Sequence, residues 1–333
     1  MRPFAYERAT DAGAAVAAIA QPGTMYLGGG TNLVDLMKLG VETPERLVDV
    51  SRLPFDRIEE RPGGGLLIGA AVRNSDLAAH RAVRERYPLL ALSLLSGASG
   101  QLRNIATTAG NLLQRTRCAY FQDVSKPCNK RQGGRDPSGC PAREGDHRNL
   151  AILGHSAACV ATHPSDMAVA LAAIGAEVHV TGLEGERTIP IPGLHRLPGD
   201  DAQRDTVLER GELVTAVELE QLAPGLAARS TYRKVRDRAS FSFAVVSVAA
   251  ALDLDGGAVR DCRIALGGVA HGPWRAWRAE EELRGGPATP ERFAAAAEAE
   301  LAQARPLRDN AFKVPLARNL ITSTLASLAG EPA

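Results

Sequence analysis

The chain has 333 residues, with 39 basic and 38 acidic side chains and a formal net charge of +1. This length exceeds the size at which one hydrophobic core usually divides, so at least two domains are expected. The balanced charge argues against a nucleic-acid-binding surface, and no apolar run reaches the roughly 20 residues of a membrane-spanning helix. Five cysteines in a chain of this length do not resemble a secreted disulfide framework, which favours reduced thiols or metal ligands.

The N-terminal region has an α/β pattern. Residues 24–27 form a short apolar strand that runs into a glycine turn and then into a helix, because the apolar residues from Leu33 onward recur at helical spacing. Residues 45–50 and 65–72 are predicted strands, and residues 74–98 are predicted to be helical. Alternating strands and helices indicate an α/β arrangement.

A long irregular segment interrupts this pattern. Between Arg115 and Asn149 the sequence has no sustained helical or strand period, and loops of this length are usually functional or disordered. Order resumes with a predicted strand that begins at Ala157, a helix that starts at residues 164–166, and another strand.

A domain boundary is predicted at residues 220–228, between a finished strand and a new unit. Beyond it, residues 242–255 and 259–270 are predicted strands, and the region from 278 to 331 is rich in alanine and predicted to be helical. We therefore expect one domain at 1–222 and a second at 228–333.

The glycine turn after residues 24–27 is a candidate phosphate site. Glycines between a strand and a helix let backbone N–H groups approach a phosphate closely at the positive end of the helix dipole. The sequence GGGTN is neither the G-x-G-x-x-G dinucleotide fingerprint nor a Walker P-loop, so the motif alone assigns neither mechanism. An ordinary turn is an equally good interpretation of the glycines alone.

Four segments read together resemble one family. They are LGGGTNLVDLMK (27–38), NIATTAGNLL (104–113), HPSDMAVAL (163–171) and YRKVRDRASFSFAVV (232–246), and they resemble the FAD-binding subunits of molybdenum hydroxylases. The resemblance covers nearly the whole chain and includes residues 263–285 in the C-terminal region. It implies an α+β fold: a vanillyl-alcohol-oxidase type FAD-binding domain with two α/β subdomains, followed by a C-terminal domain with a small antiparallel sheet and helices.

The resemblance also implies specific contacts to FAD. A first turn would wrap the pyrophosphate, formed by Leu27, Gly28, Gly29, Gly30, Thr31, Asn32 and Leu33. A second flavin-contacting turn would contain Thr107, Gly110 and Asn111.

Three more positions match the family's flavin contacts. Asp166, after Ser165, matches an acidic contact to the cofactor, Val214 matches an apolar position near the isoalloxazine, and Lys234 matches a lysine near the flavin ring. A cation there would favour the negative charge that two-electron reduction leaves on the ring. Judged without the resemblance, Asp166 could simply cap its helix, and Lys234 could lie on a solvated strand face.

The irregular segment holds most of the cysteines. Cys118, Cys128, Cys140 and Cys159 lie within or just after it, whereas Cys262 lies in an apolar strand and is predicted to be core. Their spacing matches neither compact ferredoxin motifs nor zinc ribbons, so spacing alone leaves zinc, iron-sulfur and free thiols open.

The charges of this segment favour an anionic ligand. Eight basic residues (115, 117, 126, 130, 131, 135, 143 and 148) stand against four acidic ones (123, 136, 144 and 146), and cations would stabilise a four-thiolate cluster. One branch of the family carries a loop with a 4Fe-4S cluster, and the segment at about 115–160 resembles the version in bacterial aldehyde oxidoreductases, including all four cysteines. The resemblance thus implies that these four cysteines bind a 4Fe-4S cluster.

The function implied by the resemblance is electron transfer within a molybdenum hydroxylase, most closely an aldehyde oxidoreductase. The partners would be a large molybdopterin-binding subunit and a small 2Fe-2S subunit in a heterotrimer. The alternatives are a subunit of a xanthine dehydrogenase or hydroxybenzoyl-CoA reductase-like enzyme, a self-contained FAD oxidoreductase, and a zinc-stabilised interaction module. The N-terminus lacks the pattern of a signal peptide, so we expect a cytoplasmic protein, or a periplasmic one if a signal-bearing partner exports the complex.

Overall fold

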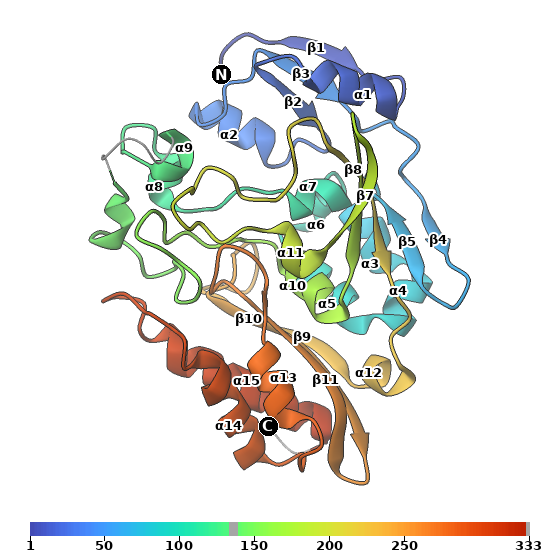
Figure 1. Cartoon of the computed structure of the whole chain (residues 1–333), viewed down its shortest axis with the longest axis vertical. Helices are drawn as coiled ribbons and strands as arrows, with labels where there is room; N and C mark the ends of the chain where they lie inside the picture. Colours follow the sequence, from blue (N-terminus) through green and yellow to red (C-terminus); the bar gives the residue numbers. More distant parts are fainter. Residues whose placement is uncertain (133–138, 331–333) are drawn as a thin grey trace.

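The computed structural model describes residues 1–132 and 139–330, which form three sheets with helices between and around them (Figure 1). The N-terminal sheet is parallel and has the order β1-β3-β2. Its strands are β1 (Ala5–Arg8), β2 (Thr24–Leu27) and β3 (Arg46–Asp49). Helices α1 (Ala12–Ile19) and α2 (Leu33–Leu39) make the crossovers that parallel strands require.

The second sheet is antiparallel and has the order β4-β5-β8-β6-β7. Its strands are β4 (Ile58–Glu60), β5 (Leu66–Gly69), β6 (Glu177–Gly182), β7 (Gly185–Pro190) and β8 (Leu213–Leu219). The helices of this region are α3 (Asn74–Ala79), α4 (Arg81–Arg86), α5 (Pro88–Ser96), α6 (Gly100–Arg103), α7 (Thr108–Leu112), α10 (Asp166–Ile174) and α11 (Ile191–Leu194). Buried side chains of α5 and α10 share one core with β5, β6 and β8.

The helix predicted over residues 74–98 is three helices in the structure. His80 has an extended backbone between α3 and α4, and Tyr87 leaves the helical region between α4 and α5. Pro88 explains the second break, because proline disfavours the helical conformation for the residue before it. Tyr87 is buried there, and its hydroxyl donates to the Glu220 carbonyl oxygen.

The C-terminal sheet is antiparallel, with the order β12-β11-β10-β9. Its strands are β9 (Ser230–Val235), β10 (Val246–Asp255), β11 (Ala258–Gly267) and β12 (Trp274–Arg275). Helix α12 (Pro224–Ala228) precedes it, and α13 (Trp277–Leu283), α14 (Pro290–Leu301) and α15 (Lys313–Ala329) follow, which confirms the helical prediction for the C-terminal region.

Both faces of this sheet are covered. Val248 and Ala250 of β10 belong to the core formed with α13, α14 and α15, whereas Ala249 between them joins the core of α5 and α10. Successive residues of a strand point to opposite faces, so β10 is apolar along almost its whole length. Helices α5 and α10 thus lie between the second and third sheets (Figure 1).

The cysteine segment has little regular structure, as expected. It contains only α8 (Ala119–Gln122), α9 (Asn129–Gln132) and a 3-10 turn (Pro141–Arg143) among the described residues, while Arg135 and Asp136 lie outside the described residues. The strand predicted from Ala157 is wrong. The backbone there makes single hydrogen bonds, such as Ala151 N–H to the Val160 carbonyl, and joins no sheet.

The predicted fold class is confirmed: two α/β units precede an antiparallel sheet with helices. Nowhere in residues 1–132 and 139–330 is there a helix with the length and apolar character needed to cross a membrane.

Candidate functional site: two turns between two cavities

The first turn joins β2 to α2 and offers unpaired donors. The backbone N–H groups of residues 29–33 donate to no acceptor in the described part of the chain. Gly30 has φ of +73°, a conformation that favours glycine, and Leu27 at the end of β2 packs beside it. Such a concave row of N–H groups suits an anion.

The second turn packs directly against the first. A Cβ on Gly29 would lie 2.2 Å from the carbonyl oxygen of Ile105, and one on Gly28 would lie 3.1 Å from Thr107 Oγ1. The approach of the second turn therefore requires glycine at position 29 and leaves little room for a side chain at position 28, which the sequence alone did not reveal. Thr107 caps α7, because its hydroxyl accepts from the Gly110 N–H at 3.2 Å.

Asn111 connects the second turn to α10. Its Oδ1 accepts a hydrogen bond from Ser165 Oγ at 2.6 Å, and the same hydroxyl accepts from the Ala168 N–H. Ser165 is therefore the N-cap of α10, and the interpretation of Asp166 as the cap is wrong. Asp166 is the first helical residue and is left available for other contacts.

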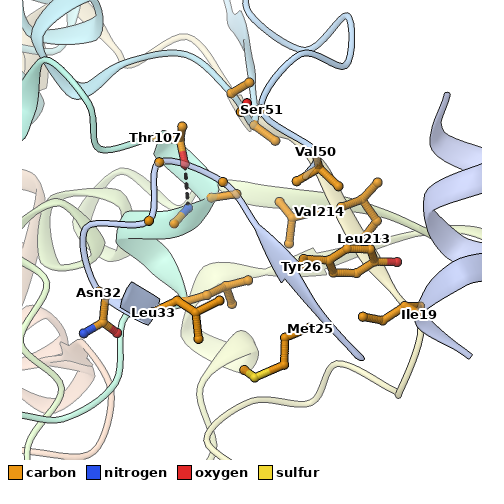
Figure 2. A pocket seen from close by; sticks show the side chains of 18 of the residues that line it. Ile19, Met25, Tyr26, Asn32, Leu33, Val50, Ser51, Thr107, Leu213 and Val214 are labelled. Carbon is orange, nitrogen blue, oxygen red and sulfur yellow. Dashed lines mark hydrogen bonds between the residues drawn. The ribbon is translucent and has the colours of Figure 1, made fainter. Parts of the chain in front are cut away.

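Two cavities meet at the turns. The first has a volume of about 410 Å³ and the second about 340 Å³, and Thr31, Asn32 and Gly110 line both. Figure 2 shows the first cavity, with Asn32 at one end and Ile19 at the other. A single elongated molecule bound across the turns would extend into both cavities.

The predicted contacts are divided between the cavities. Val214 lines the first with Tyr26 and Leu33, whereas Asp166 and Asn111 line the second. The structure therefore brings together all of the predicted turn residues, but it places Val214 and Asp166 in different cavities. The two positions would face different parts of a bound cofactor.

Lys234 is not on a solvated strand face. Its side chain is buried, and Nζ donates to Asp166 Oδ2 at 2.7 Å and to the Ser96 carbonyl oxygen at 3.1 Å. Arg236 donates to the same carbonyl oxygen at 3.2 Å. Burial raises the pKa of Asp166, and the Lys234 ammonium opposes that rise.

Tyr232 is a site residue that the sequence analysis missed. Its hydroxyl donates to Asp166 Oδ1, and its side chain is buried. A signal was present, because Tyr232 and Lys234 are two residues apart on β9 and therefore share a face.

The residues at the turns fit a dinucleotide such as FAD. The Asn32 side chain lines both cavities, and its buried Nδ2 has no hydrogen-bond partner in the described residues, whereas its Oδ1 accepts from the Arg115 N–H. A buried donor without a partner is costly, and a bound acceptor would remove that cost. This amide and the N–H groups of residues 29–33 are suited to hold a pyrophosphate.

The four cysteines of the irregular segment gather in one place. Cys118, Cys128, Cys140 and Cys159 belong to one cluster of buried or half-buried side chains around Phe121. Cys262 lies in the core of the C-terminal region, as predicted.

The thiols influence one another. Burial raises the pKa of Cys118 to about 11, and the neighbouring Cys140 and Cys128 add to that rise. Cys159 donates a hydrogen bond to Cys140, which lowers the pKa of Cys140 and raises that of Cys159. These sulfurs are thus neighbours in space although 41 positions separate the first from the last.

Most of the loop's cations are engaged elsewhere. Arg115 pairs with Glu42 and Asp205, and Arg131 donates to the carbonyls of Tyr120 and Phe121. The expected excess of positive charge is therefore largely balanced by carboxylates and carbonyl groups.

Two cations do act on the sulfurs. The buried Lys130, which is ion-paired with Asp205, opposes the rise in the pKa of Cys159, and Arg143 adds to the lowering of the pKa of Cys140. Each favours the thiolate that a metal ligand requires.

Within residues 1–132 and 139–330, no group of three or more His, Cys, Asp or Glu side chains is arranged to hold a metal ion. Tetrahedral zinc requires four ligands at about 2.0 to 2.3 Å from one ion, so this finding lends the zinc alternative no geometric support. The same finding lends the 4Fe-4S assignment no geometric support, so that assignment remains a prediction.

Residues 305–313 hold the cysteine segment from the C-terminal side. Asn310 Nδ2 donates to the carbonyls of Leu150 and Ala151, and Lys313 Nζ donates to the Leu150 carbonyl at 2.9 Å. The Asp309 N–H donates to His147 Nε2 at 2.9 Å. We call residues 305–313 the clamp.

Two family descriptions match the chain. Residues 2–220 match the FAD binding domain in molybdopterin dehydrogenase, and residues 230–328 match the CO dehydrogenase flavoprotein C-terminal domain. The chain belongs to the FAD-binding subunits of the molybdenum hydroxylase family. As a member of this family it is a subunit of an oxidoreductase, as the sequence analysis predicted.

Known relatives span the whole chain. The aldehyde oxidoreductase FAD-binding subunit PaoB of Escherichia coli (strain K12) is 51% identical over 98% of both chains. The carbon monoxide dehydrogenase medium chain of Hydrogenophaga pseudoflava is 28% identical over 92% of this chain and 88% of its own. A solved structure of that organism's carbon monoxide dehydrogenase, lacking the Mo-pyranopterin moiety, superposes with a TM-score of 0.76 at 26% identity and covers all of both chains.

Proposed function

We propose that this subunit binds FAD and transfers electrons within an aldehyde oxidoreductase. The observation that carries the proposal is the meeting of two cavities at a row of unpaired backbone donors, beside the orphaned Asn32 amide. The relative that is 51% identical is named as an aldehyde oxidoreductase subunit, which supports an aldehyde as substrate of the whole enzyme.

The two cavities suggest which end of FAD each would hold. Residues 28–33, with Thr107, Gly110 and Asn111, would hold the pyrophosphate where the cavities meet. The second cavity, next to Asp166, Lys234 and Arg236, would hold the isoalloxazine, since cations favour the anionic reduced ring. Val214, for which the resemblance implies a place near the isoalloxazine, would then face the adenosine end in the first cavity instead.

FAD would supply a centre that accepts two electrons and releases them to an external acceptor. The protein's own groups would orient the ring and set its electrostatic surroundings. Substrate oxidation would take place on a large molybdopterin-binding partner, and a small 2Fe-2S partner would deliver the electrons. The relatives named as medium chains support such a heterotrimer.

A 4Fe-4S cluster on Cys118, Cys128, Cys140 and Cys159 belongs to the same proposal. It is supported by the gathering of the four thiols in one cluster and by the action of Lys130 and Arg143 on Cys159 and Cys140. Binding free energy of about 10 kcal/mol or more, by analogy with zinc modules, would order a segment with so little regular structure.

Anaerobic purification from the native cell tests these points together. The expected preparation contains two companion chains, bound flavin and a broad brown absorbance, with iron and acid-labile sulfide beyond the content of the 2Fe-2S partner. The isolated subunit should carry flavin but should not oxidise aldehydes. Steady turnover by the isolated chain would support a self-contained FAD oxidoreductase instead, and flavin-free protein would overturn the proposal.

A further inference from the structure

Strand β9 presents two donors to one buried carboxylate. Tyr232 Oη donates to Asp166 Oδ1 at 2.5 Å, and Lys234 Nζ donates to Oδ2 at 2.7 Å. The two donors are two positions apart and so lie on the same face of the strand, opposite the N-terminus of α10. Each oxygen of the carboxylate therefore has its own partner from the C-terminal sheet.

The charges around Asp166 are few and can be named. Lys234 and Arg236 approach from β9 and the residue after it, and Ser96 at the end of α5 accepts from both. Across the second cavity lie Arg103 and the pair Arg117–Asp35.

The Tyr232 hydroxyl is a permanent donor in this setting. Burial and the adjacent carboxylate raise the pKa of Tyr232 well above its ordinary value, so it does not ionise at physiological pH. Its hydrogen bond lowers the pKa of Asp166, against the burial that raises it. Tyr232 thus favours the ionised carboxylate, and the ionised carboxylate neutralises the Lys234 ammonium.

We propose that Tyr232 is a positioning residue that keeps Asp166 ionised and paired with Lys234, and thereby limits the positive charge available to the flavin. This inference rests on the proposed function, because it takes the second cavity as the place of the flavin ring. Without the hydroxyl, Asp166 takes up a proton more readily, and the Lys234 charge is no longer balanced. An unbalanced cation stabilises the reduced, negatively charged ring, so the flavin's midpoint potential rises.

The experiment compares Tyr232→Phe with Tyr87→Phe in the purified complex. Tyr87 is also a buried tyrosine, and its hydroxyl donates to the Glu220 carbonyl, so its variant controls for the loss of a buried hydroxyl. The flavin's midpoint potential is measured by spectroelectrochemistry from pH 5.5 to pH 9. Tyr232→Phe should raise the potential, most at the acidic end, while Tyr87→Phe should follow the wild type.

Asp166→Asn is the second variant, because an amide imitates the protonated carboxyl group. It should raise the potential across the whole pH range, and adding Tyr232→Phe to it should produce no further change. A Tyr232→Phe curve that overlays the wild type, or an additive effect in the double variant, would overturn the inference. Flavin-free wild-type protein would instead remove the proposed function itself, so the two failures are distinguishable.

Discussion

The flavin turns and the cysteine segment are built in different ways. In the turns, short stretches hold one another through backbone contacts, as where Gly29 lies against the Ile105 carbonyl. In the cysteine segment, four side chains gather from a stretch with little helix or strand, and the clamp of the C-terminal region fixes its far side. The first site therefore depends on the close approach of two backbone turns, and the second on side chains of the C-terminal region together with its proposed cluster.

This difference predicts that the two sites fail independently. A substitution that disrupts the first turn should release flavin and leave iron bound to the cysteine segment. Substitution of a cysteine or of a clamp residue should affect the loop and leave the flavin bound. The hydrogen bond that joins the segment to the first turn, from the Arg115 N–H to Asn32 Oδ1, lies at the first residue of the segment and involves neither a cysteine nor the clamp.

Gly29→Ala is expected to reduce flavin binding more than any other substitution proposed for the two sites. The added Cβ would lie 2.2 Å from a backbone oxygen that cannot move alone, so the two turns must separate. We expect loss of nearly all bound flavin and destabilisation by about 1 to 3 kcal/mol, measured by flavin absorbance and thermal unfolding. Gly100→Ala is the control, since a Cβ there meets nothing within 4 Å. Full flavin content in Gly29→Ala would contradict the steric argument.

Cys128→Ser should remove the iron proposed for the cysteine segment while flavin stays bound. Serine is a poor ligand for iron in such a cluster, and the loop should lose order with it. Cys262→Ser is the matched control, because Cys262 is also buried but lies in a different core. The iron and acid-labile sulfide contents of both variants are measured. Equal iron in the two variants would show that Cys128 is not a ligand.

The turns were identified as a flavin site through the family resemblance, which rests on several short local signals. Glycines after a strand, a Thr-x-x-Gly turn and a Ser-Asp helix start each occupy a few consecutive residues, and the structure brings these segments together. The sequence did not reveal why position 29 must be glycine and why position 28 has little room for a side chain. That reason lies in Ile105 and Thr107, about 77 positions away in the chain.

The sequence shows which charged residues and cysteines the segment contains, but it did not predict the contacts that they make. Its charges suggested cations around a cluster, yet Arg115 and Arg131 are used by carboxylates and carbonyls that no spacing rule identifies. The sequence did not predict the clamp, because Asn310 and Lys313 are polar residues of a kind that is common near the start of a helix. Only the tertiary structure shows that they satisfy buried carbonyl groups of the loop.

Asn310→Ala should loosen the cysteine segment without releasing flavin. The carbonyls of Leu150 and Ala151 lose a buried donor, which costs about 1 to 3 kcal/mol. Hydrogen exchange should become faster over residues 139–160, with flavin content unchanged. Asn319→Ala, at an exposed position of α15, should leave exchange there as in the wild type. Unchanged protection in Asn310→Ala would show that the clamp does not hold the loop.

Lys313 gives the most specific prediction, a pH dependence of stability. Burial lowers the pKa of its ammonium to about 7, and the nearby Arg148 adds to the shift. Between about pH 7 and pH 10 the unfolded chain therefore binds more protons at this lysine than the folded chain does, so its contribution to stability rises with pH, by at most about 1.4 kcal/mol per pH unit. Lys313→Met should remove this rise in urea unfolding measured at pH 7, 8 and 9. The exposed Lys126→Met serves as the control and should keep the wild-type slope; a wild-type slope in Lys313→Met as well would mean that the amine is charged in the folded protein throughout.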